Sequence, residues 1–421
     1  MQMPKETRKG GNRSILTGLD IGTSKIGVVI GELTEKGAIQ ILGVGMSPSE
    51  GLRQGVVINL DAAVQSIEKA VQEAELTAGL EVNEAVVGIA GDHIRSVNSR
   101  GVVAVSRTDH EITQADVERV IDAAKAIALP IDREVLHVLP QEFIVDNQTG
   151  IKNPVGISGV RLEAEIHIVT GAVTSAQNIV RSVKRAGIKV AGLVLEPLAS
   201  SCAVLDKSEK ELGTALVDLG GGTTDIALFC DGAIRHTAVI GLAGQNVTND
   251  IALGLRTPLA QAEQIKIKYG CSKKELVSKN DVFTVPGIGG RASREVSREV
   301  LASIIQPRME EVFSLAAKEI KRSEFGDLLG AGIVVTGGGS LLEGTEELAE
   351  EIFGMPSKIG MPQGFTGLVE SASSPVFATG VGLVLYGAGR GEEKLKGFSG
   401  EEAGMFGRIS QWMRRFVEDF F

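Results

Sequence analysis

The apolar positions at the start of the chain have the spacing of strands, and those that follow have the spacing of a helix. Three apolar runs predict a strand meander, at residues 15–20, 26–33 and 38–45. A helix is expected from Leu60 to about Leu80. Its predicted apolar face carries Val64, Ile67, Val71 and Leu76. With a further short strand at 84–90, this pattern predicts a sheet covered by helices.

A separate unit interrupts this pattern at roughly 93–170. Its expected elements are a strand at 101–105, a helix capped by Thr113, and strands at 135–145 and 160–171. The first sheet then resumes at Thr174 with another helix. The inserted unit is either a decorative β-α-β addition or a contact surface for other subunits and partners.

A second helix-covered sheet is predicted further along the chain. Its first elements are strands at 212–219 and 224–232 and a helix at 245–255. The stretch 256–328 is mostly helical and is expected to form a small subdomain. Within it, Thr257 should cap a helix that has Pro258 in its first turn. Pro307 should kink or restart a long helical pattern at about 291–321.

Three glycine-rich turns, each at the end of an apolar run, occur at 16–25, 216–225 and 333–344. Glycine lets several backbone N–H groups converge on phosphate oxygens, and hydroxyl side chains add donors. The first two turns share a pattern, which predicts a phosphate-binding hairpin in each half of the chain. The candidates are Gly22, Thr23, Ser24, Lys25, Gly220, Gly221, Gly222, Thr223 and Thr224. The charge of Lys25 is expected to face either phosphate or solvent.

The same turns predict a metal and a place for the base. Asp20 and Asp218 are expected to face each other across a polyphosphate and to hold a hydrated Mg²⁺, which takes few protein ligands. The third turn has a GGGS sequence, and Gly337, Gly338 and Gly339 would let the flat face of an adenosine lie against backbone. The chain has no GxxxxGK(S/T), and no strand is followed by GxGxxG and a helix, so P-loop and Rossmann sites are excluded.

Composition limits the remaining possibilities. A chain of 421 residues is too long for one core, so two or more domains are expected. The formal net charge of -10 argues against nucleic acid as a partner. Three cysteines without CxxC spacing make disulfides and zinc sites unexpected and indicate a reducing compartment. Residues 1–12 have no apolar core for export and are expected to be a disordered tail.

The C-terminal segment predicts an amphipathic helix at 405–421, separated from the domains by a polar, glycine-containing linker at 389–404. The residues expected to bind a membrane surface are Met405, Phe406, Ile409, Trp412, Met413, Arg414, Arg415, Phe416 and Phe420. The alternative is a helix that docks on its own domain or on a partner helix. The linker, the only tryptophan and the flanking arginines favour the membrane.

Together, the two strand-turn motifs and the strand-TGGGS motif resemble those of the actin, heat-shock chaperone and sugar-kinase superfamily. Within it, the chain from about Ile15 onward is most similar to the bacterial FtsA family. The resemblance implies an α/β, actin-like two-wall ATPase fold, in which each wall is a sheet with its helices. A small α+β subdomain is inserted, and a C-terminal amphipathic helix follows. The implied ranges are 13–92, 171–205 and 375–388 for the first wall, 93–170 for the insert, 206–255 and 329–374 for the second wall, and 256–328 for its helical subdomain.

The resemblance also implies ligands and further site residues. The cofactors are ATP and Mg²⁺, with slow or switch-like hydrolysis and no catalytic residue assigned. Glu196, in the LEPLASS stretch, would reach the metal through water. Glu263 and Lys266, one helical turn apart, would clasp the ribose and adenine. For this pair, a solvated ion pair is the alternative.

For function, the resemblance implies a protein that self-associates and tethers FtsZ polymers to the inner face of the cytoplasmic membrane at the division septum. The implied partners are the C-terminal peptide of FtsZ at residues 256–328, further copies of the chain, other division proteins and the anionic membrane surface. An actin-like ATPase of pilus or secretion assembly is the closer alternative. A small-molecule kinase is the other, although it would have no use for a tethered membrane helix.

Overall fold

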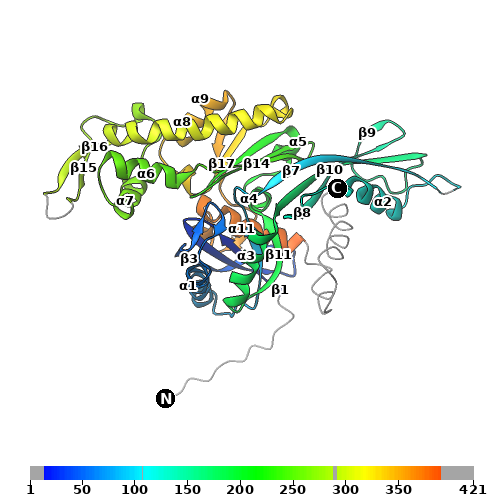
Figure 1. The fold of residues 1–421 in the computed structure, drawn as a ribbon, viewed down its shortest axis with the longest axis horizontal. Helices are drawn as coiled ribbons and strands as arrows, with labels where there is room; N and C mark the ends of the chain where they lie inside the picture. The colour runs from blue at the N-terminus through cyan, green and yellow to red at the C-terminus, as the bar shows by residue number, and fades with distance from the viewer. Residues whose placement is uncertain (1–13, 107, 288–291, 390–421) are drawn as a thin grey trace, which may run out of the picture.

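The computed structural model describes residues 14–106, 108–287 and 292–389. The expected tail at 1–12, the C-terminal helix at 405–421 and all but the first residue of the linker lie outside them. Within the described ranges, no helix has both the length and the apolar character needed to cross a bilayer. Figure 1 shows two helix-covered sheets, the first wall and the second wall, with the inserted unit extending to one side.

The first wall contains a six-stranded sheet in the order β11-β6-β1-β2-β3-β19. Its strands are β1 (Ser14–Ile21), β2 (Lys25–Leu33), β3 (Ile39–Pro48), β6 (Glu84–Ile89), β11 (Lys189–Leu195) and β19 (Phe365–Gly367). The main helices are α1 (Leu60–Ala78), α3 (Val173–Arg185), α4 (Glu196–Val204) and α11 (Ala378–Gly389). Strands β4 (Leu52–Arg53) and β5 (Val56–Val57) form a small hairpin beside this sheet.

The expected helix at 60–80 is confirmed as α1, but its predicted apolar face is wrong at Leu76, which is 86% exposed. The closest contacts of α1 with the sheet are instead made by two alanines, Ala70 and Ala74. A Cβ on Gly45 of β3 would lie 2.1 Å from the Ala70 carbonyl oxygen and 3.0 Å from the Ala74 Cβ. The helix therefore packs nearly onto the backbone of β3, and a large side chain on that face would not fit.

The second wall contains a five-stranded sheet in the order β14-β13-β12-β17-β18. Its strands are β12 (Thr214–Leu219), β13 (Thr224–Cys230), β14 (Ala233–Ile240), β17 (Ile333–Thr336) and β18 (Ser357–Ile359). Its helices are α5 (Lys207–Leu212), α6 (Gly244–Gly254), α7 (Leu259–Tyr269), α8 (Arg298–Arg322) and α9 (Thr345–Phe353). Short elements complete the two walls: α10 (Val369–Ala372) and 3₁₀ turns η1 (Lys274–Leu276), η2 (Gly326–Leu328), η3 (Gly338–Leu341) and η4 (Pro375–Phe377).

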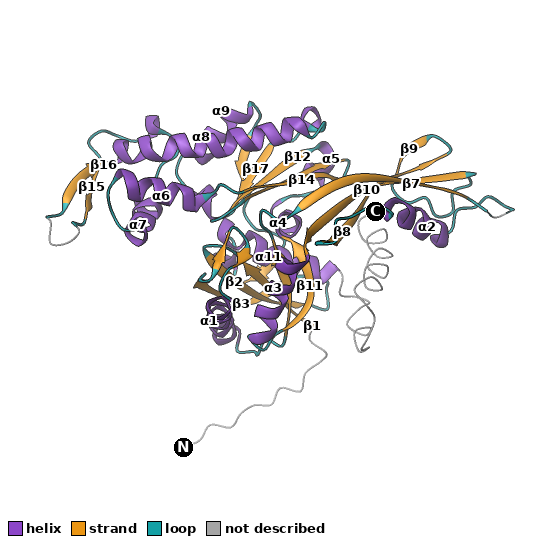
Figure 2. Ribbon diagram, viewed as in Figure 1, coloured by secondary structure: helices purple, strands orange, loops and turns teal. Residues whose placement is uncertain are grey.

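Helices α4 and α11 connect the two walls (Figure 2). The two helices cross so closely that a Cβ on Gly382 of α11 would lie 2.0 Å from the Ala199 carbonyl oxygen of α4. Apolar residues of α4 share one core with the first sheet and with Leu216 and Val334 of the second. A single apolar layer therefore spans both sheets at the place where the glycine-rich turns end their strands.

Two expectations for the helical stretch are corrected. The helix at Pro258 begins at Leu259, so that Pro258 is its N-cap and not a first-turn residue. Helix α8 begins at Arg298 and not at about 291, and it does not restart at Pro307. Its buried face holds it against the second wall, which offsets the hydrogen bond that proline cannot donate. That face comprises Leu301, Ala302, Ile305, Met309, Val312, Phe313, Ala316 and Ile320. Part of the expected helix is strand β16 (Arg294–Ser297), paired with β15 (Val282–Val285).

The inserted unit is a four-stranded sheet in the order β7-β10-β8-β9, covered by one helix. Its elements are β7 (Arg95–Ala104), α2 (Gln114–Lys125), β8 (Arg133–Val145), β9 (Gln148–Ile151) and β10 (Arg161–Ala172). Thr113 is the N-cap of α2 as expected, and its backbone N–H donates to the Asp116 carboxylate at 2.9 Å. A Cβ on Gly101 would lie 2.3 Å from the Val120 carbonyl oxygen, so α2 rests directly on β7.

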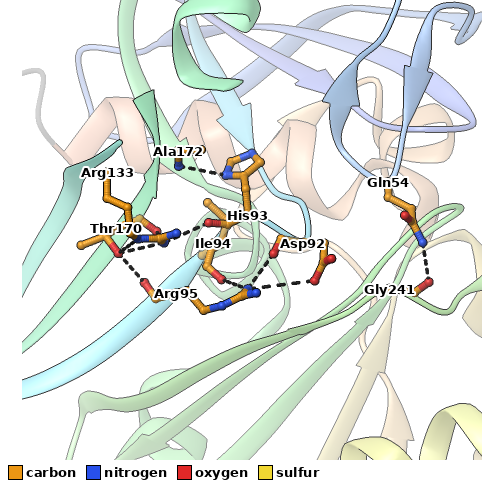
Figure 3. A network of polar contacts seen from close by, with 9 residues as sticks. All are labelled: Gln54, Asp92, His93, Ile94, Arg95, Arg133, Thr170, Ala172 and Gly241. Carbon is orange, nitrogen blue, oxygen red and sulfur yellow. Dashed lines mark hydrogen bonds and ion pairs between the residues drawn. The ribbon is translucent and has the colours of Figure 1, made fainter. Parts of the chain in front are cut away.

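The insert is fastened to both walls. Toward the first wall, the Leu195 N–H of β11 donates to the His137 Nε2 of β8 at 2.9 Å. At the base of the insert, the Arg133 guanidinium donates to the carbonyl oxygens of His93 and Thr170, each at 2.9 Å (Figure 3). These two residues lie where the chain enters and leaves the insert. Toward the second wall, side chains of the insert donate to backbone carbonyls of β14. The donors are Ser96 to Thr237 at 3.0 Å, Asn98 to Arg235 at 3.3 Å, and Gln141 to Ile234 at 2.9 Å and Arg235 at 3.1 Å.

Candidate nucleotide-binding site

The first two glycine-rich turns form hairpins of the same design. In the β1–β2 hairpin, Asp20 pairs with Gly27, and the Gly22 N–H donates to the Lys25 carbonyl at 3.0 Å. In the β12–β13 hairpin, Asp218 pairs with Asp225, and the Gly220 N–H donates to the Thr223 carbonyl at 3.0 Å. Each first strand also has a parallel neighbour, β6 or β17. The repetition expected from the sequence is therefore present in the backbone.

The tips of the two hairpins meet. A Cβ on Gly221 would lie 2.3 Å from the Ser24 Oγ, and a Cβ on Gly222 would lie 2.4 Å from the Thr23 Oγ1. The structure thus brings together the hydroxyl residues of one hairpin and the glycines of the other. Any side chain at the two glycines would push the hairpins apart. Thr224, at the end of the second tip, instead donates its hydroxyl to the Leu242 carbonyl at 2.7 Å.

The tip of the β4–β5 hairpin joins this contact to the second wall. The Gly55 N–H donates to the Thr23 Oγ1 at 3.0 Å, and the Gln54 Nε2 donates to the Gly241 carbonyl at 2.9 Å (Figure 3). Gln54 has a φ of 48°, a left-handed conformation that is uncommon for glutamine. The first hairpin is therefore connected to the second wall through the β4–β5 tip, whose Gln54 lies 187 residues before Gly241 in the sequence.

Behind the tips, the predicted metal-site carboxylates gather. Asp20 and Asp218 are 4% and 8% exposed. The Asp218 Oδ2 accepts from the Ser200 hydroxyl at 2.6 Å and from the Thr379 hydroxyl at 3.4 Å, donors that α4 and α11 supply. Glu196 is the first residue of α4 and is half-buried. A Cβ on Gly88 would lie 3.1 Å from the Glu196 Cγ, so β6 and α4 also meet here.

A fourth carboxylate, Asp225, was missed by the sequence analysis. It is 3% exposed, and its Oδ2 accepts from the Thr223 hydroxyl at 2.8 Å, whereas its Oδ1 has no partner. Burial, followed by repulsion from Asp218, raises the pKa of Asp225 to about 7. Burial and the charges of Asp20, Asp225 and Asp218 also raise the pKa of Glu196. The signal was available in the sequence, because a short hairpin that closes at Leu219 and Thr224 places Asp225 opposite Asp218.

The donor set suits a hydrated cation. In the described part of the chain, no three His, Cys, Asp or Glu side chains lie close enough together to ligate a metal directly. Nonetheless, four carboxylates influence one another here, and the Asp225 Oδ1 is buried without a partner. Mg²⁺ keeps several of its waters and takes few protein ligands, so it fits such a group. The magnesium ion and its assigned residues stay predictions.

The predicted adenosine pair lies next to the second hairpin. Helix α6 begins on that hairpin, because the N–H groups of Gly244 and Gln245 donate to the carbonyls of Gly220 and Gly221 at 3.1 and 2.8 Å. The Lys266 Nζ lies 3.0 Å from the Gly244 carbonyl oxygen and 2.8 Å from the Glu263 Oε2. The Lys266 side chain is 12% exposed and that of Glu263 41%, so the pair is only partly solvated.

The three glycines of the third turn differ in their surroundings. A Cβ on Gly337, which has a φ of 82°, would lie 2.4 Å from the Asp218 Oδ1, and one on Gly339 would lie 2.4 Å from the Leu219 Cγ. These two glycines are required by the close approach of the turn to β12. A Cβ on Gly338 would meet only the Val376 Cγ2, at 3.9 Å. Gly338 therefore has open space in front of it.

Replacing Gly338 by valine is expected to block nucleotide binding while the protein still folds. The branched side chain would occupy the space in which the purine is predicted to lie, and the backbone of Gly338 is not in the left-handed region. The measurement is the thermal shift on adding ATP, with circular dichroism as the check on folding. A folded Gly338→Val protein that keeps the ATP shift of the parent would show that the turn has only a structural role.

Comparison with known proteins decides the family. A model of cell division protein FtsA matches residues 215–382, and a model of the SHS2 domain inserted in FTSA matches residues 91–170. Cell division protein FtsA of Pseudomonas aeruginosa is 49% identical over 95% of this chain and 97% of the relative. The chain belongs to the FtsA family. Cell division protein FtsA of Escherichia coli is 40% identical over 97% of both chains. The FtsA-family chain is therefore a cell division protein.

Solved structures confirm the fold class of this FtsA-family chain. The PilM-PilN type IV pilus biogenesis complex has a TM-score of 0.63 and 17% identity, covering 89% of this chain and 98% of that one. MreB5 of Spiroplasma citri bound to ADP has a TM-score of 0.51 and 15% identity, covering 87% and 94%. At such identities the likeness concerns the fold alone. The pilus and kinase alternatives are not favoured, because the relatives of high identity are cell division proteins.

Proposed function

We propose that this chain binds ATP with Mg²⁺ between its two hairpins and tethers FtsZ polymers to the inner face of the cytoplasmic membrane at the division septum. The observation that carries the nucleotide part is the meeting of two hairpins of one design, backed by buried carboxylates. Membership of a cell-division family supports the cellular part. MreB5, which shares the fold, was solved bound to ADP.

In this proposal the backbone N–H groups and hydroxyls of the two tips hold the phosphates, because such groups donate to anionic oxygens without needing a charge. Asp20, Asp218 and Glu196 would hold Mg²⁺ through its water shell, and the metal would neutralise charge on the phosphates. Lys266 and Glu263 would contact the ribose and adenine, with the backbone of Gly338 against the purine. Bound ATP would fix the relative position of the two walls, a shape suited to self-association.

The membrane part rests on the sequence of 405–421, which the structure does not describe. One amphipathic helix binds a bilayer only marginally and reversibly, whereas linked copies gain about 10²- to 10⁴-fold in avidity. We therefore expect the anchor to act on a homopolymer of the chain. The stretch 256–328 is proposed to receive the FtsZ C-terminal peptide. It contains α7, the β15–β16 pair and α8.

The test is a recruitment assay on anionic vesicles with fluorescent FtsZ polymers. We expect FtsZ to sediment with the vesicles only when this chain is present, and more of it with Mg-ATP than without nucleotide. FtsZ that lacks its C-terminal peptide serves as the matched control and should remain in the supernatant. FtsZ that sediments with vesicles in the absence of this chain, or FtsZ that sediments without its C-terminal peptide, would refute the tethering role.

A further inference from the structure

The ammonium of Lys25 has a carboxylate neighbour that charge alone did not predict. Its Nζ lies 2.5 Å from the Oδ2 of Asp20, and the Lys25 side chain is 21% exposed. Lys25 begins β2, and its backbone carbonyl accepts from the Gly22 N–H, so the first hairpin itself sets where this side chain starts. The positive charge therefore sits against a buried carboxylate, inside the group to which the metal is assigned.

The charges around this ammonium are unbalanced. The Lys25 ammonium is paired with the Asp20 carboxylate, which is 4% exposed, and Glu196 and Asp218 are the other acids assigned to the same metal. Asp225 adds a fourth acidic group that acts on both Glu196 and Asp218 through space. A buried carboxylate without a compensating charge is costly, and here the lysine provides that charge directly to Asp20.

We propose that Lys25 is an internal counter-ion that holds the place of the metal when no nucleotide is bound. This inference rests on the proposed function, because it concerns the residues assigned to Mg²⁺ there. In the free protein the ammonium neutralises Asp20 and its neighbours, so a bare metal ion gains little by entering. When Mg-nucleotide arrives, the phosphates offer the displaced ammonium a new partner. Metal binding thus becomes dependent on nucleotide through one side chain.

Replacing Lys25 by methionine removes the charge and keeps the length of the side chain. We expect the nucleotide-free Lys25→Met protein to melt at least about 5 °C below the parent, because buried carboxylates lose their counter-ion. Millimolar Mg²⁺ without nucleotide should then raise the melting temperature of this variant and leave that of the parent unchanged. The measurement is differential scanning fluorimetry of the full chain in EDTA and in MgCl₂.

The chain offers a matched control in Lys125. Its Nζ lies 2.6 Å from the Asp122 Oδ1 and its side chain is 22% exposed, values close to those of Lys25. Asp122, however, is 62% exposed, and the pair lies on helix α2 of the insert. Lys125→Met should change the melting temperature little and gain no response to Mg²⁺, because an exposed ion pair contributes at most about 1 kcal/mol.

A second variant keeps the proposal testable if Lys25→Met folds poorly. Asp20→Asn combined with Lys25→Met removes both charges, and this double variant should be more stable than Lys25→Met and respond less to Mg²⁺. A double variant no more stable than Lys25→Met, or a Lys25→Met protein as insensitive to Mg²⁺ as the parent, would overturn the counter-ion role. ATP binding by the parent is measured separately. Its absence would refute the nucleotide site, whereas the counter-ion role of Lys25 is decided by the melting temperatures in EDTA and in MgCl₂ without nucleotide.

Discussion

Replacing Asp218 by alanine is expected to weaken Mg-ATP binding at least about tenfold, a loss of roughly 1.4 kcal/mol or more. Asp218 is 8% exposed and is positioned by two hydroxyls, those of Ser200 on α4 and Thr379 on α11. Its removal takes one carboxylate from the hydrated metal and leaves these hydroxyls without their acceptor. Both helices belong to the apolar layer that joins the two walls, so the substitution would disturb the hydrogen bonds at the centre of the site.

Isothermal titration with ATP, in Mg²⁺ and in EDTA, measures this effect. The difference between the two conditions should shrink in Asp218→Ala, because the metal contributes less. Asp218→Asn keeps the volume and tests the charge alone. Asp122→Ala, which removes an exposed carboxylate from helix α2, is the control and should bind ATP like the parent. Equal affinity of the Asp218→Ala protein and the parent would refute the assignment.

Removing residues 405–421 is expected to abolish binding to anionic vesicles and leave ATP binding intact. The linker predicted at 389–404 would separate the predicted helix from the domains, and every described element of both walls ends at or before Gly389. Trp412→Glu should do much the same, because a charge in the centre of an apolar stripe costs desolvation energy that a marginal anchor cannot offset. Paired Arg414→Ala and Arg415→Ala changes should weaken binding by about 1 kcal/mol per charge, and less at high salt.

The observable is the fraction of protein that sediments with vesicles of graded anionic content. ATP binding by the truncated protein, measured by thermal shift, is the control on folding. If the truncated protein still sediments with vesicles, the membrane role of 405–421 is refuted. If truncation unfolds the domains, the segment packs against them and the membrane role is refuted as well. If the paired Arg414→Ala and Arg415→Ala changes weaken binding to anionic vesicles equally at low and high salt, the charges of the two arginines are not the cause of the loss.

Local pattern was enough to find both hairpins. A β-branched run that ends in Asp and Gly predicts a strand and its turn, and Asp20 and Asp218 do lie at the ends of β1 and β12. The contact between the two tips could not be derived from pattern alone. It depends on how α4 and α11 join the sheets, through approaches as close as that of Gly382 to Ala199. Such contacts are set by packing between segments far apart in sequence.

The errors have a common physical origin. Helical periodicity placed Leu76 on the core face of α1, yet small alanines make that contact because β3 presents glycines there. Proline weakens a helix locally, yet α8 continues through Pro307 because its apolar face is buried along its length. In each case tertiary surroundings outweighed a local preference.

The fastening of the insert to the second wall has a consequence for assembly. Strand β14 is an edge strand, and an unpaired edge is a template on which another chain can add a strand. Here Ser96, Asn98 and Gln141 already donate to three of its carbonyls. An incoming strand would first have to displace these side chains. This edge of the second wall is thereby protected against the addition of a strand from another chain.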